Sequence, residues 1–475
     1  MDAAGTEHEH GWLRLEAGRI AALGPGHPPS EQSLRPDAEP TPEPPTTPPR
    51  VGSGPPATRQ DRRSGAGAGA SRPSQQNGES LLDLRGAVVT PGLVNTHHHL
   101  YQTLTRAQAQ QADLFTWLRL LYPTWARIDA EMLYAAARTG LAELALSGCT
   151  TAFDHHYVFP RGVTGLLEAE LAAARDIGLR FVASRGSMDL GVSDGGLPPD
   201  VLAEDLDAIL ADTERVAALA DGDLLQVAVA PCSPFSVTTR LMEESAALAR
   251  RLGLRLHTHL AETVEEGEYC SELYGCTPVE YLERVGWVAD DVWCAHCVHI
   301  SDDEARGFGA AGVGVAHCPT SNLRLGTGIA PVRALLDAGG RVGLGADGSA
   351  SNERSDLLFE VKQALLVARA RGGPAAMDAR EALRLATSGG ASVLGRDDIG
   401  SLEPGKRADL AVWRTDGLEL AGAADLVGGL VLSAPHRVDR LFVGGEEVVR
   451  GGRLVNAAEE EIAREQRIQA ARLAR

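Results

Sequence analysis

The sequence predicts an α/β protein: a TIM (β/α)8 barrel with a small appended β-sandwich domain formed from both chain ends. Two patterns in the 475 residues predict it. Short apolar, β-rich runs alternate with longer Ala/Leu-rich segments of helical period, as parallel strands with crossover helices do. About eight such runs over roughly 300 residues fit a closed barrel better than an open sheet. Short strand-like segments with glycine turns lie on both sides of this region and are expected to pair with each other.

The eight expected barrel strands are apolar runs, and most of them end in a polar residue. They are Ala87–Val94, Thr150–Asp154, Arg180–Arg185, Leu224–Pro231, Arg255–His259, Val292–His296, Val313–Cys318 and Arg341–Asp347. Helices with one apolar face are expected between them, including Glu131–Leu146, Val201–Leu219, Arg240–Leu252 and Ser355–Arg369. Catalytic groups of barrel enzymes project from the carboxyl ends of the strands, so the polar strand ends are candidates as a set.

The N-terminal part of the small β domain is assigned to residues 1–90, and the barrel to residues 91–399. Trp12–Leu23 alternates and breaks at Gly18, as a hairpin does. Residues 27–79 are rich in Pro, Gly, Ser and Gln. Such a segment cannot bury enough apolar surface to offset its chain entropy, so a disordered insert is expected there.

The C-terminal part of the small β domain is assigned to residues 400–475. Gly405–Trp413 and Val438–Val449 have the pattern of short strands with glycine turns. Ala457–Arg475 is a charged amphipathic segment. It predicts a terminal helix that is either a solvated tail or a packing arm.

Charge and composition limit the partners and the compartment. Lys+Arg 45 against Asp+Glu 64 gives a net charge of −19, which argues against nucleic acid and anionic membranes as partners. No apolar run approaches the ~20 residues of a bilayer span. Met1–His10 is acidic rather than signal-like, which favours a cytoplasmic protein.

The 7 cysteines are too scattered for a disulfide framework and are expected to be free thiols. We further expect a homo-oligomer that acts on a small molecule.

Histidines follow the first expected strand in Asn95-Thr-His-His-His99. Because side chains alternate in an extended segment, His97 and His99 point to one side and His98 to the other, so the pair can bind one metal ion. Taken alone, the motif is equally well explained as a surface histidine cluster. Its interpretation therefore depends on the other strand ends.

A third histidine and two carboxylates lie at two other strand ends. His257-Thr-His-Leu-Ala-Glu262 ends one strand, and Gly343-Leu-Gly-Ala-Asp347 ends the last. Three imidazoles and one carboxylate make a site for Zn or Fe with room for water. His257 and His259 are both possible ligands. His259 is preferred because it lies at the strand tip and places Glu262 one short turn further on.

The order of these motifs resembles the amidohydrolase superfamily, and within it the mononuclear-metal deaminase and chlorohydrolase-like branch. The matching segments are Val89–His99, His259–Glu262, Ala295–His299, Ala316–Val332 and Gly345–Asn352. Within the branch, three segments are similar to 8-oxoguanine deaminases: His99–Arg106, Ser147–Tyr157 and Ala183–Gly191. Triazine-processing aminohydrolases share some of them.

The resemblance implies a hydrolytic deaminase with one bound ion, Zn²⁺, with Fe²⁺ as the alternative. The implied metal ligands are His97, His99, His259 and Asp347. Asp347 would also take the proton that the attacking water loses. Glu262 would protonate a ring nitrogen beside the attacked carbon, and His296 would steady the tetrahedral intermediate.

The implied substrate is 8-oxoguanine, which gives uric acid and ammonia. The alternatives are another aminated ring, of the hydroxylated s-triazine, guanine, cytosine or isocytosine type, and a non-catalytic ligand-binding barrel. Gln102, Arg185 and His317 are the candidates for binding the substrate. An amide or a guanidinium matches the carbonyl acceptors of a purine dione.

Two other enzyme classes fit poorly. Gly191-Val-Ser-Asp-Gly195 has the nucleophile-elbow pattern of serine hydrolases, but Gly196-Leu-Pro-Pro follows where a helix is required. Base-flipping zinc deaminases use His-x-Glu with Pro-Cys-x-x-Cys, which this sequence lacks. Members of the resembled family open with a further strand or two before the segment at Trp12–Leu23. The chain is therefore expected to begin late and its small domain to be incomplete.

Overall fold

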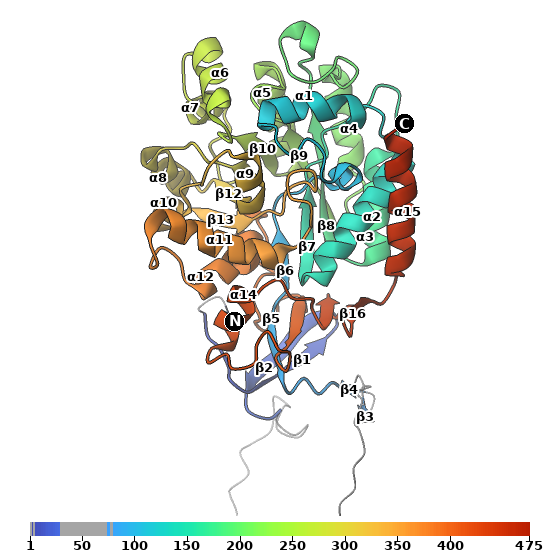
Figure 1. Cartoon of the computed structure of the whole chain (residues 1–475), viewed down its shortest axis with the longest axis vertical. Helices are drawn as coiled ribbons and strands as arrows, with labels where there is room; N and C mark the ends of the chain where they lie inside the picture. Colours follow the sequence, from blue (N-terminus) through green and yellow to red (C-terminus); the bar gives the residue numbers. More distant parts are fainter. Residues whose placement is uncertain (1, 3–4, 29–73, 77–78) are drawn as a thin grey trace, which may run out of the picture.

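The computed structural model describes residues 2, 5–28, 74–76 and 79–475, and within them a closed barrel stands on a small β domain (Figure 1). Around the barrel the strands are β6 (Leu93–Asn95), β7 (Cys149–Asp154), β8 (Arg180–Ser187), β9 (Leu225–Pro231), β10 (Leu256–Leu260), β11 (Val292–His296), β12 (Gly314–His317) and β13 (Arg341–Leu344). Neighbouring strands are parallel, and β13 pairs with β6 through Leu344 and Asn95, which closes the ring. The predicted TIM barrel is confirmed.

The prediction of one continuous strand over Ala87–Val94 was wrong. The structure divides it at Gly92: β5 (Ala87–Pro91) pairs antiparallel with β14 (Leu410–Arg414) in the small domain, and only β6 enters the barrel. A Cβ atom at position 92 would lie 2.2 Å from the side chain of Thr150. The close approach at this junction therefore requires glycine.

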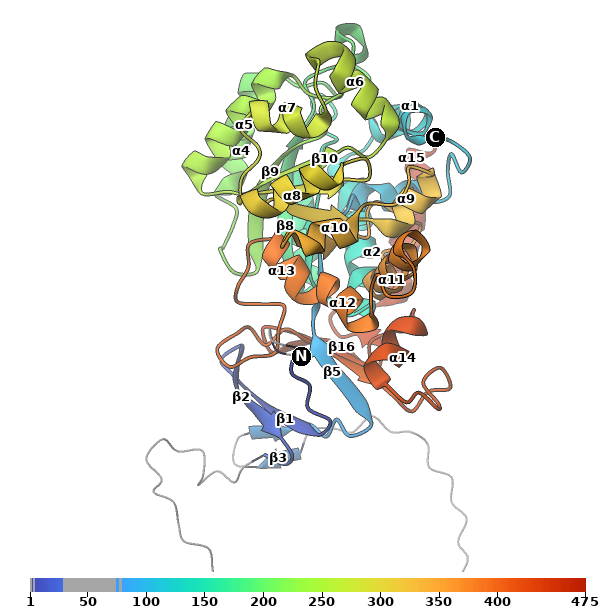
Figure 2. The ribbon, with the colours of Figure 1, turned by 90° about the vertical axis from the view of Figure 1, so that its left-hand side faces the viewer.

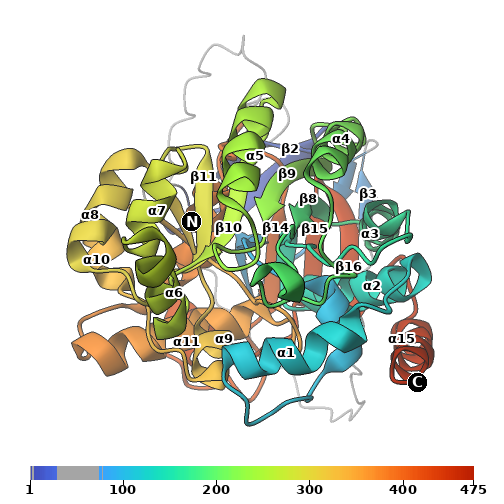
Figure 3. The same ribbon diagram turned by 90° about the horizontal axis from the view of Figure 1, so that it is seen from above.

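Helices surround the barrel strands (Figure 3). They are α1 (Leu114–Trp125), α2 (Ala130–Leu146), α3 (Leu166–Ile177), α4 (Leu206–Ala217), α5 (Thr239–Leu252), α6 (Val264–Tyr274), α7 (Pro278–Arg284), α8 (Asp302–Ala311), α9 (Pro319–Leu325), α10 (Val332–Asp337), α11 (Leu357–Gly372), α12 (Ala379–Arg384) and α13 (Gly390–Val393). The helix expected from Val201 begins only at Leu206, because the side chain of Asp205 caps it by accepting from two backbone N–H groups. Among the described residues, no helix has the length and apolar character of a membrane span.

The small domain has two layers formed from both chain ends, as predicted. Its five-stranded sheet runs in the order β17 (Arg453–Leu454), β16 (Glu446–Arg450), β15 (Arg440–Val443), β14 and β5, and α14 (Leu426–Leu432) precedes β15 in the chain. The expected N-terminal hairpin is β1 (Gly11–Glu16) and β2 (Arg19–Pro25), which lies beside β5 (Figure 2). Ile20 of this hairpin shares an apolar cluster with Leu410 and Val412 of β14.

Most of the expected insert, 27–79, lies outside the described residues, which leave out 29–73 and 77–78. Its described end includes β3 (Ser74–Gln76), which pairs antiparallel with β4 (Glu79–Leu81). That part of the insert is a strand.

The C-terminal helix α15 (Glu459–Leu473) is a packing arm, one of the two alternatives that the sequence left open (Figure 1). Ile462 and Leu473 are buried. The side chain of Gln466 donates to Oγ1 of Thr103 at 3.1 Å. Thr103 belongs to the 3-10 helix η2 (Leu100–Thr105), which directly follows β6 and its histidines.

An apolar layer fills the barrel interior at the end that faces away from the polar strand ends. It contains strand residues Val94, Phe153, Val182, Ala228, Trp293 and Ala316 together with Ala391 and Val393 of α13. This layer closes that end, so the polar side chains gather at the carboxyl ends of the strands. All seven cysteines of the chain are buried free thiols, as expected.

Candidate metal-dependent active site

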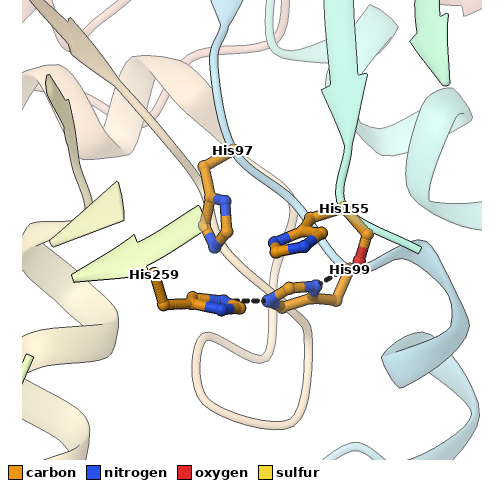
Figure 4. Close-up of side chains that lie close together, drawn as sticks. All are labelled: His97, His99, His155 and His259. Atoms are coloured by element: carbon orange, nitrogen blue, oxygen red, sulfur yellow. Dashed lines mark hydrogen bonds between the residues drawn. The ribbon is translucent and has the colours of Figure 1, made fainter. Parts of the chain in front are cut away.

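Four histidine rings meet at the carboxyl end of the barrel (Figure 4). His97 and His99 follow β6, His155 follows β7, and His259 lies in β10. One nitrogen of each ring lies within 4.8 Å of the others, and all four residues are buried. The structure thus brings together the three histidines that the sequence analysis selected and adds His155.

Hydrogen bonds define the tautomers of two of these rings. Nδ1 of His99 lies 2.7 Å from the carbonyl oxygen of His155, and Nδ1 of His259 lies 2.7 Å from that of Cys232. Burial lowers the pKa of both imidazoles well below the usual range, so they are neutral. Because a carbonyl only accepts, each Nδ1 carries the proton and each Nε2 keeps its lone pair. The two Nε2 atoms lie 3.1 Å apart, an arrangement that a cation between them stabilises.

Asp347 brings a carboxylate to the same place. Its Oδ1 lies 3.4 Å from Nε2 of His97 and 3.4 Å from Nε2 of His99. Burial raises the pKa of Asp347, but His97, His296 and His99 outweigh it and hold that pKa well below its usual value. Nε2 of His97 is buried with no hydrogen-bond partner among the described residues. Three nitrogens and one carboxylate therefore offer free donor atoms to one ion.

Glu262 and His296 lie next to each other beside these donors. Oε2 of Glu262 lies 3.4 Å from Nε2 of His296, whose Nδ1 lies 2.9 Å from Oδ1 of Asn322. Burial raises the pKa of Glu262 to about 7. Burial lowers the pKa of His296, but the carboxylates of Glu262 and Asp347 outweigh it and raise that pKa. A carboxyl group that titrates near neutral pH is suited to proton transfer.

A second buried carboxylate holds the turn that carries Glu262. Glu266 accepts from the backbone N–H groups of Ala261 at 2.8 Å and of Glu262 at 3.2 Å. Ala261 has a φ of 49°, which is uncommon for a residue other than glycine. Glu266 lies in the acidic first turn of α6, but the structure buries it completely.

A cavity lies against these polar groups. On its polar side are His99, Gln102, His259, Glu262, His296 and Asp347; the other lining residues are Leu114, Trp117, Leu118, Tyr122, Tyr157, Cys232, Ser233, Phe235, Leu325 and Ser351. The aromatic residues of this wall were not predicted as site residues. The lining residues of α1 together have helical spacing (Leu114, Trp117, Leu118 and Tyr122), and such spacing indicates a buried face without saying what the face covers.

The three candidates for substrate binding lie in different places. Gln102 lines the cavity, and its Oε1 is buried without a hydrogen-bond partner in the described part of the chain. Arg185 is not among the lining residues: its guanidinium donates to Asp212 at 2.6 Å and to Glu204 at 2.7 Å. His317 is buried at the end of β12, also outside the lining. The guanidinium of Arg185 is therefore already bound within the protein.

Two alternatives from the sequence also have clear positions. His257, the competing ligand, points to His97 rather than into the cluster of four rings, with its Nε2 2.9 Å from Nδ1 of His97. The Gly191–Gly195 segment contains an exposed 3-10 turn, Val192–Asp194, rather than a strand-to-helix elbow. The serine-hydrolase pattern therefore has no structural counterpart here.

The chain belongs to the amidohydrolase family, whose model matches residues 88–448. It is similar to 8-oxoguanine deaminase of Pseudomonas aeruginosa, with 48% identity over 383 residues that cover 79% of this chain and 85% of that protein. It is also similar to isoxanthopterin deaminase from an unknown prokaryotic organism, with 40% identity over 409 residues, 81% of this chain and 84% of that protein.

Among solved structures, the chain resembles atrazine chlorohydrolase TrzN from Arthrobacter aurescens TC1 complexed with zinc. The TM-score is 0.82 at 31% identity, covering 96% of this chain and 94% of that chain. Together these matches confirm the family resemblance. The chain is a metal-dependent deaminase, a hydrolase that acts on carbon–nitrogen bonds.

Proposed function

We propose that the chain deaminates an aminated purine-like heterocycle, with 8-oxoguanine as substrate and uric acid and ammonia as products, and that it uses one zinc ion. One observation carries the proposal. Three imidazoles and the carboxylate of Asp347 converge at the edge of a cavity, next to a glutamate whose pKa is about 7.

His97, His99, His259 and Asp347 would hold the zinc. Three neutral imidazoles and a carboxylate are a donor set that zinc binds, and Fe²⁺ is the alternative. The facing lone pairs of His99 and His259, 3.1 Å apart, support a cation at this point. Bound zinc lowers the pKa of a water molecule to near neutrality.

The side chains around this point divide the proton transfers. Asp347 accepts the proton that the attacking water loses, and the water oxygen adds to the ring carbon that bears the amino group. Glu262, as the carboxylic acid, gives its proton to the neighbouring ring nitrogen, so negative charge does not accumulate there. His296, 3.4 Å from Glu262 and 3.9 Å from Asp347, places an N–H group near the oxygen that becomes charged. Asp347 then gives its proton to the amino nitrogen and the carbon–nitrogen bond breaks. The hydroxyl group of the intermediate returns a proton to Glu262 as it becomes the ring carbonyl, and ammonia leaves.

The choice of substrate rests on the cavity wall and on the relatives. Trp117, Tyr122, Tyr157 and Phe235 suit a flat ring, and the unpartnered amide oxygen of Gln102 can accept from a ring N–H. The 48% identity to an 8-oxoguanine deaminase favours that ring over the alternatives.

We also propose a cytoplasmic homo-oligomer. The seven buried free thiols suit a reducing compartment. Sedimentation of the purified protein tests the oligomer, and a monomer at micromolar concentration would refute it.

The test of the activity is ammonia release by the purified protein, before and after metal removal by a chelator. The substrates are 8-oxoguanine, isoxanthopterin, guanine, isocytosine, cytosine and aminated triazines. We expect the highest kcat/KM with 8-oxoguanine, loss of activity on chelation and recovery with Zn²⁺. A higher value with another ring would refute the substrate, and recovery with Fe²⁺ alone would refute zinc. A protein that binds a purine but releases no ammonia with any metal would support the non-catalytic barrel.

A further inference from the structure

His257 is fully buried behind the cluster of four rings, and the mechanism above does not use it. We propose that His257 is a positioning residue that fixes the tautomer of His97 through two hydrogen bonds in series, which end at the backbone carbonyl of Trp293. The inference rests on the proposed function, because it concerns how one metal ligand is prepared for the ion.

The series of hydrogen bonds has only one consistent direction. Nδ1 of His257 lies 3.0 Å from the carbonyl oxygen of Trp293, which only accepts. A neutral His257 therefore carries its proton on Nδ1 and a lone pair on Nε2. That Nε2 lies 2.9 Å from Nδ1 of His97, so Nδ1 of His97 is the donor. The lone pair of His97 is then on Nε2, the atom that faces Asp347.

The surroundings of His257 hold it in one orientation. Its ring lies between those of Phe153 and Trp293, with centroid distances of 4.7 Å to each. The indole N–H of Trp293 donates to the carbonyl of Thr96 at 3.1 Å, next to His97 in the chain. Trp293 therefore holds both ends of the pair, one through its carbonyl and the other through its ring.

His97 differs in this respect from the other two proposed histidine ligands. Nδ1 of His99 and Nδ1 of His259 each face a backbone carbonyl directly, whereas Nδ1 of His97 faces a side chain. A backbone carbonyl remains as an acceptor when the side chain of its residue is substituted. The acceptor nitrogen of His257 belongs to the side chain and is lost on substitution. The tautomer of His97 is thus the one that depends on the identity of a second residue.

The strand register explains why two histidines stand in His257-Thr-His259. They lie on the same face of β10 because side chains alternate. In the parallel pairing of β10 with β11, His257 lies opposite Trp293. One histidine of the pair therefore faces the metal donors and the other supports His97 from behind.

The experiment measures zinc affinity of the metal-free protein by competition with a chromophoric chelator. His257→Phe keeps an aromatic ring but removes the acceptor, and we expect its zinc affinity to fall ~10–100-fold, the usual effect of losing a partner of a metal ligand. His257→Gln keeps an acceptor oxygen, and most of the affinity should return. The matched control is His156→Phe, which removes another fully buried imidazole, one that pairs with Glu170; wild-type affinity is expected.

A measurement on the wild-type protein tests the same inference without any substitution. ¹⁵N chemical shifts of the metal-free protein report which nitrogen of His97 is protonated, and we expect Nδ1 in the wild type and a mixture in His257→Phe. Protonation at Nε2 in the wild type would overturn the inference. So would unchanged zinc affinity in His257→Phe, or an equal loss in His156→Phe. A wild-type protein that binds no zinc would instead refute the proposed function.

Discussion

Asp347 and His97 are joined twice across the seam of the barrel. The backbone N–H of Asp347 donates to the carbonyl of His97 at 3.0 Å, and the carboxylate of Asp347 lies 3.4 Å from Nε2 of the same histidine. Asp347 has a φ of 60°, a left-handed conformation that residues other than glycine adopt only when their surroundings hold them there. The closure between β13 and β6 therefore places the proposed carboxylate ligand.

Asp347→Asn tests that carboxylate. The amide keeps the size of the side chain but can no longer accept the proton of the attacking water. We expect a protein that folds normally and loses at least ~100-fold in kcat, the scale of removing an acid–base group. Ammonia release measured beside the circular dichroism spectrum checks both parts. Turnover within a few-fold of the wild type would refute the role of Asp347.

Glu262→Gln tests the proton donor in the same way. An amide cannot protonate the ring nitrogen, so kcat should again fall at least ~100-fold with the fold unchanged. Glu265→Gln is the matched control, because Glu265 is exposed and only three positions further along the chain. The control should keep wild-type turnover. If Glu262→Gln kept it as well, the assignment of the acid would be wrong.

The ion pair between Arg180 and Asp409 connects barrel strand β8 to the start of β14 in the small domain, and substitution of Asp409 tests its contribution to stability. Arg180 of β8 donates to the buried Asp409 at 2.6 Å and to the half-exposed Asp223 at 2.6 Å. Asp409→Ala leaves a buried guanidinium without that partner, so the free energy of unfolding should fall by about 3–5 kcal/mol. Asp223→Ala removes a partner at the surface and should cost at most about 1 kcal/mol. Urea titration of both variants measures the difference, and equal losses would contradict the prediction.

The buried carboxyl group of Glu360 should make the free energy of unfolding depend on pH. Burial raises the pKa of Glu360 from 4.5 to about 8. Between these values the unfolded chain loses this proton while the folded protein keeps it, so the contribution of Glu360 to stability decreases as pH rises. Glu360→Gln cannot ionise, and its stability relative to the wild type should therefore increase from pH 5 to pH 8. Urea titration at both pH values checks the sign, and an opposite trend would show that the carboxyl group is ionised in the folded protein.

Local patterns were sufficient to predict much of the site. Alternation in an extended segment places His97 and His99 together, and the carboxyl ends of parallel strands bring them to His259 and Asp347. The boundary at Gly92 was missed although Pro91-Gly92 is a turn signal inside Ala87–Val94. The two halves are separated by their pairing partners, which lie far along the chain.

Other features depend on tertiary contacts that a local pattern does not contain. Arg185 lies in a barrel strand as predicted, but Asp212 of α4 and Glu204 bind its guanidinium. His257 and His259 lie on the same face of β10, so alternation alone does not tell them apart. Their hydrogen-bond partners do: the carbonyl of Trp293 for His257 and the carbonyl of Cys232 for His259. The aromatic wall from α1 likewise follows from how that helix crosses the end of the barrel.

The position of α15 has a practical consequence for handling the protein. Gln466 reaches Thr103, four residues after His99, and Arg127 donates to the carbonyl of Leu473 at 2.7 Å. Removing residues 466–475 would take away the outer support of the segment that follows His99. Affinity tags are therefore better placed at the N-terminus, and a tag at the other end needs a flexible spacer beyond Arg475.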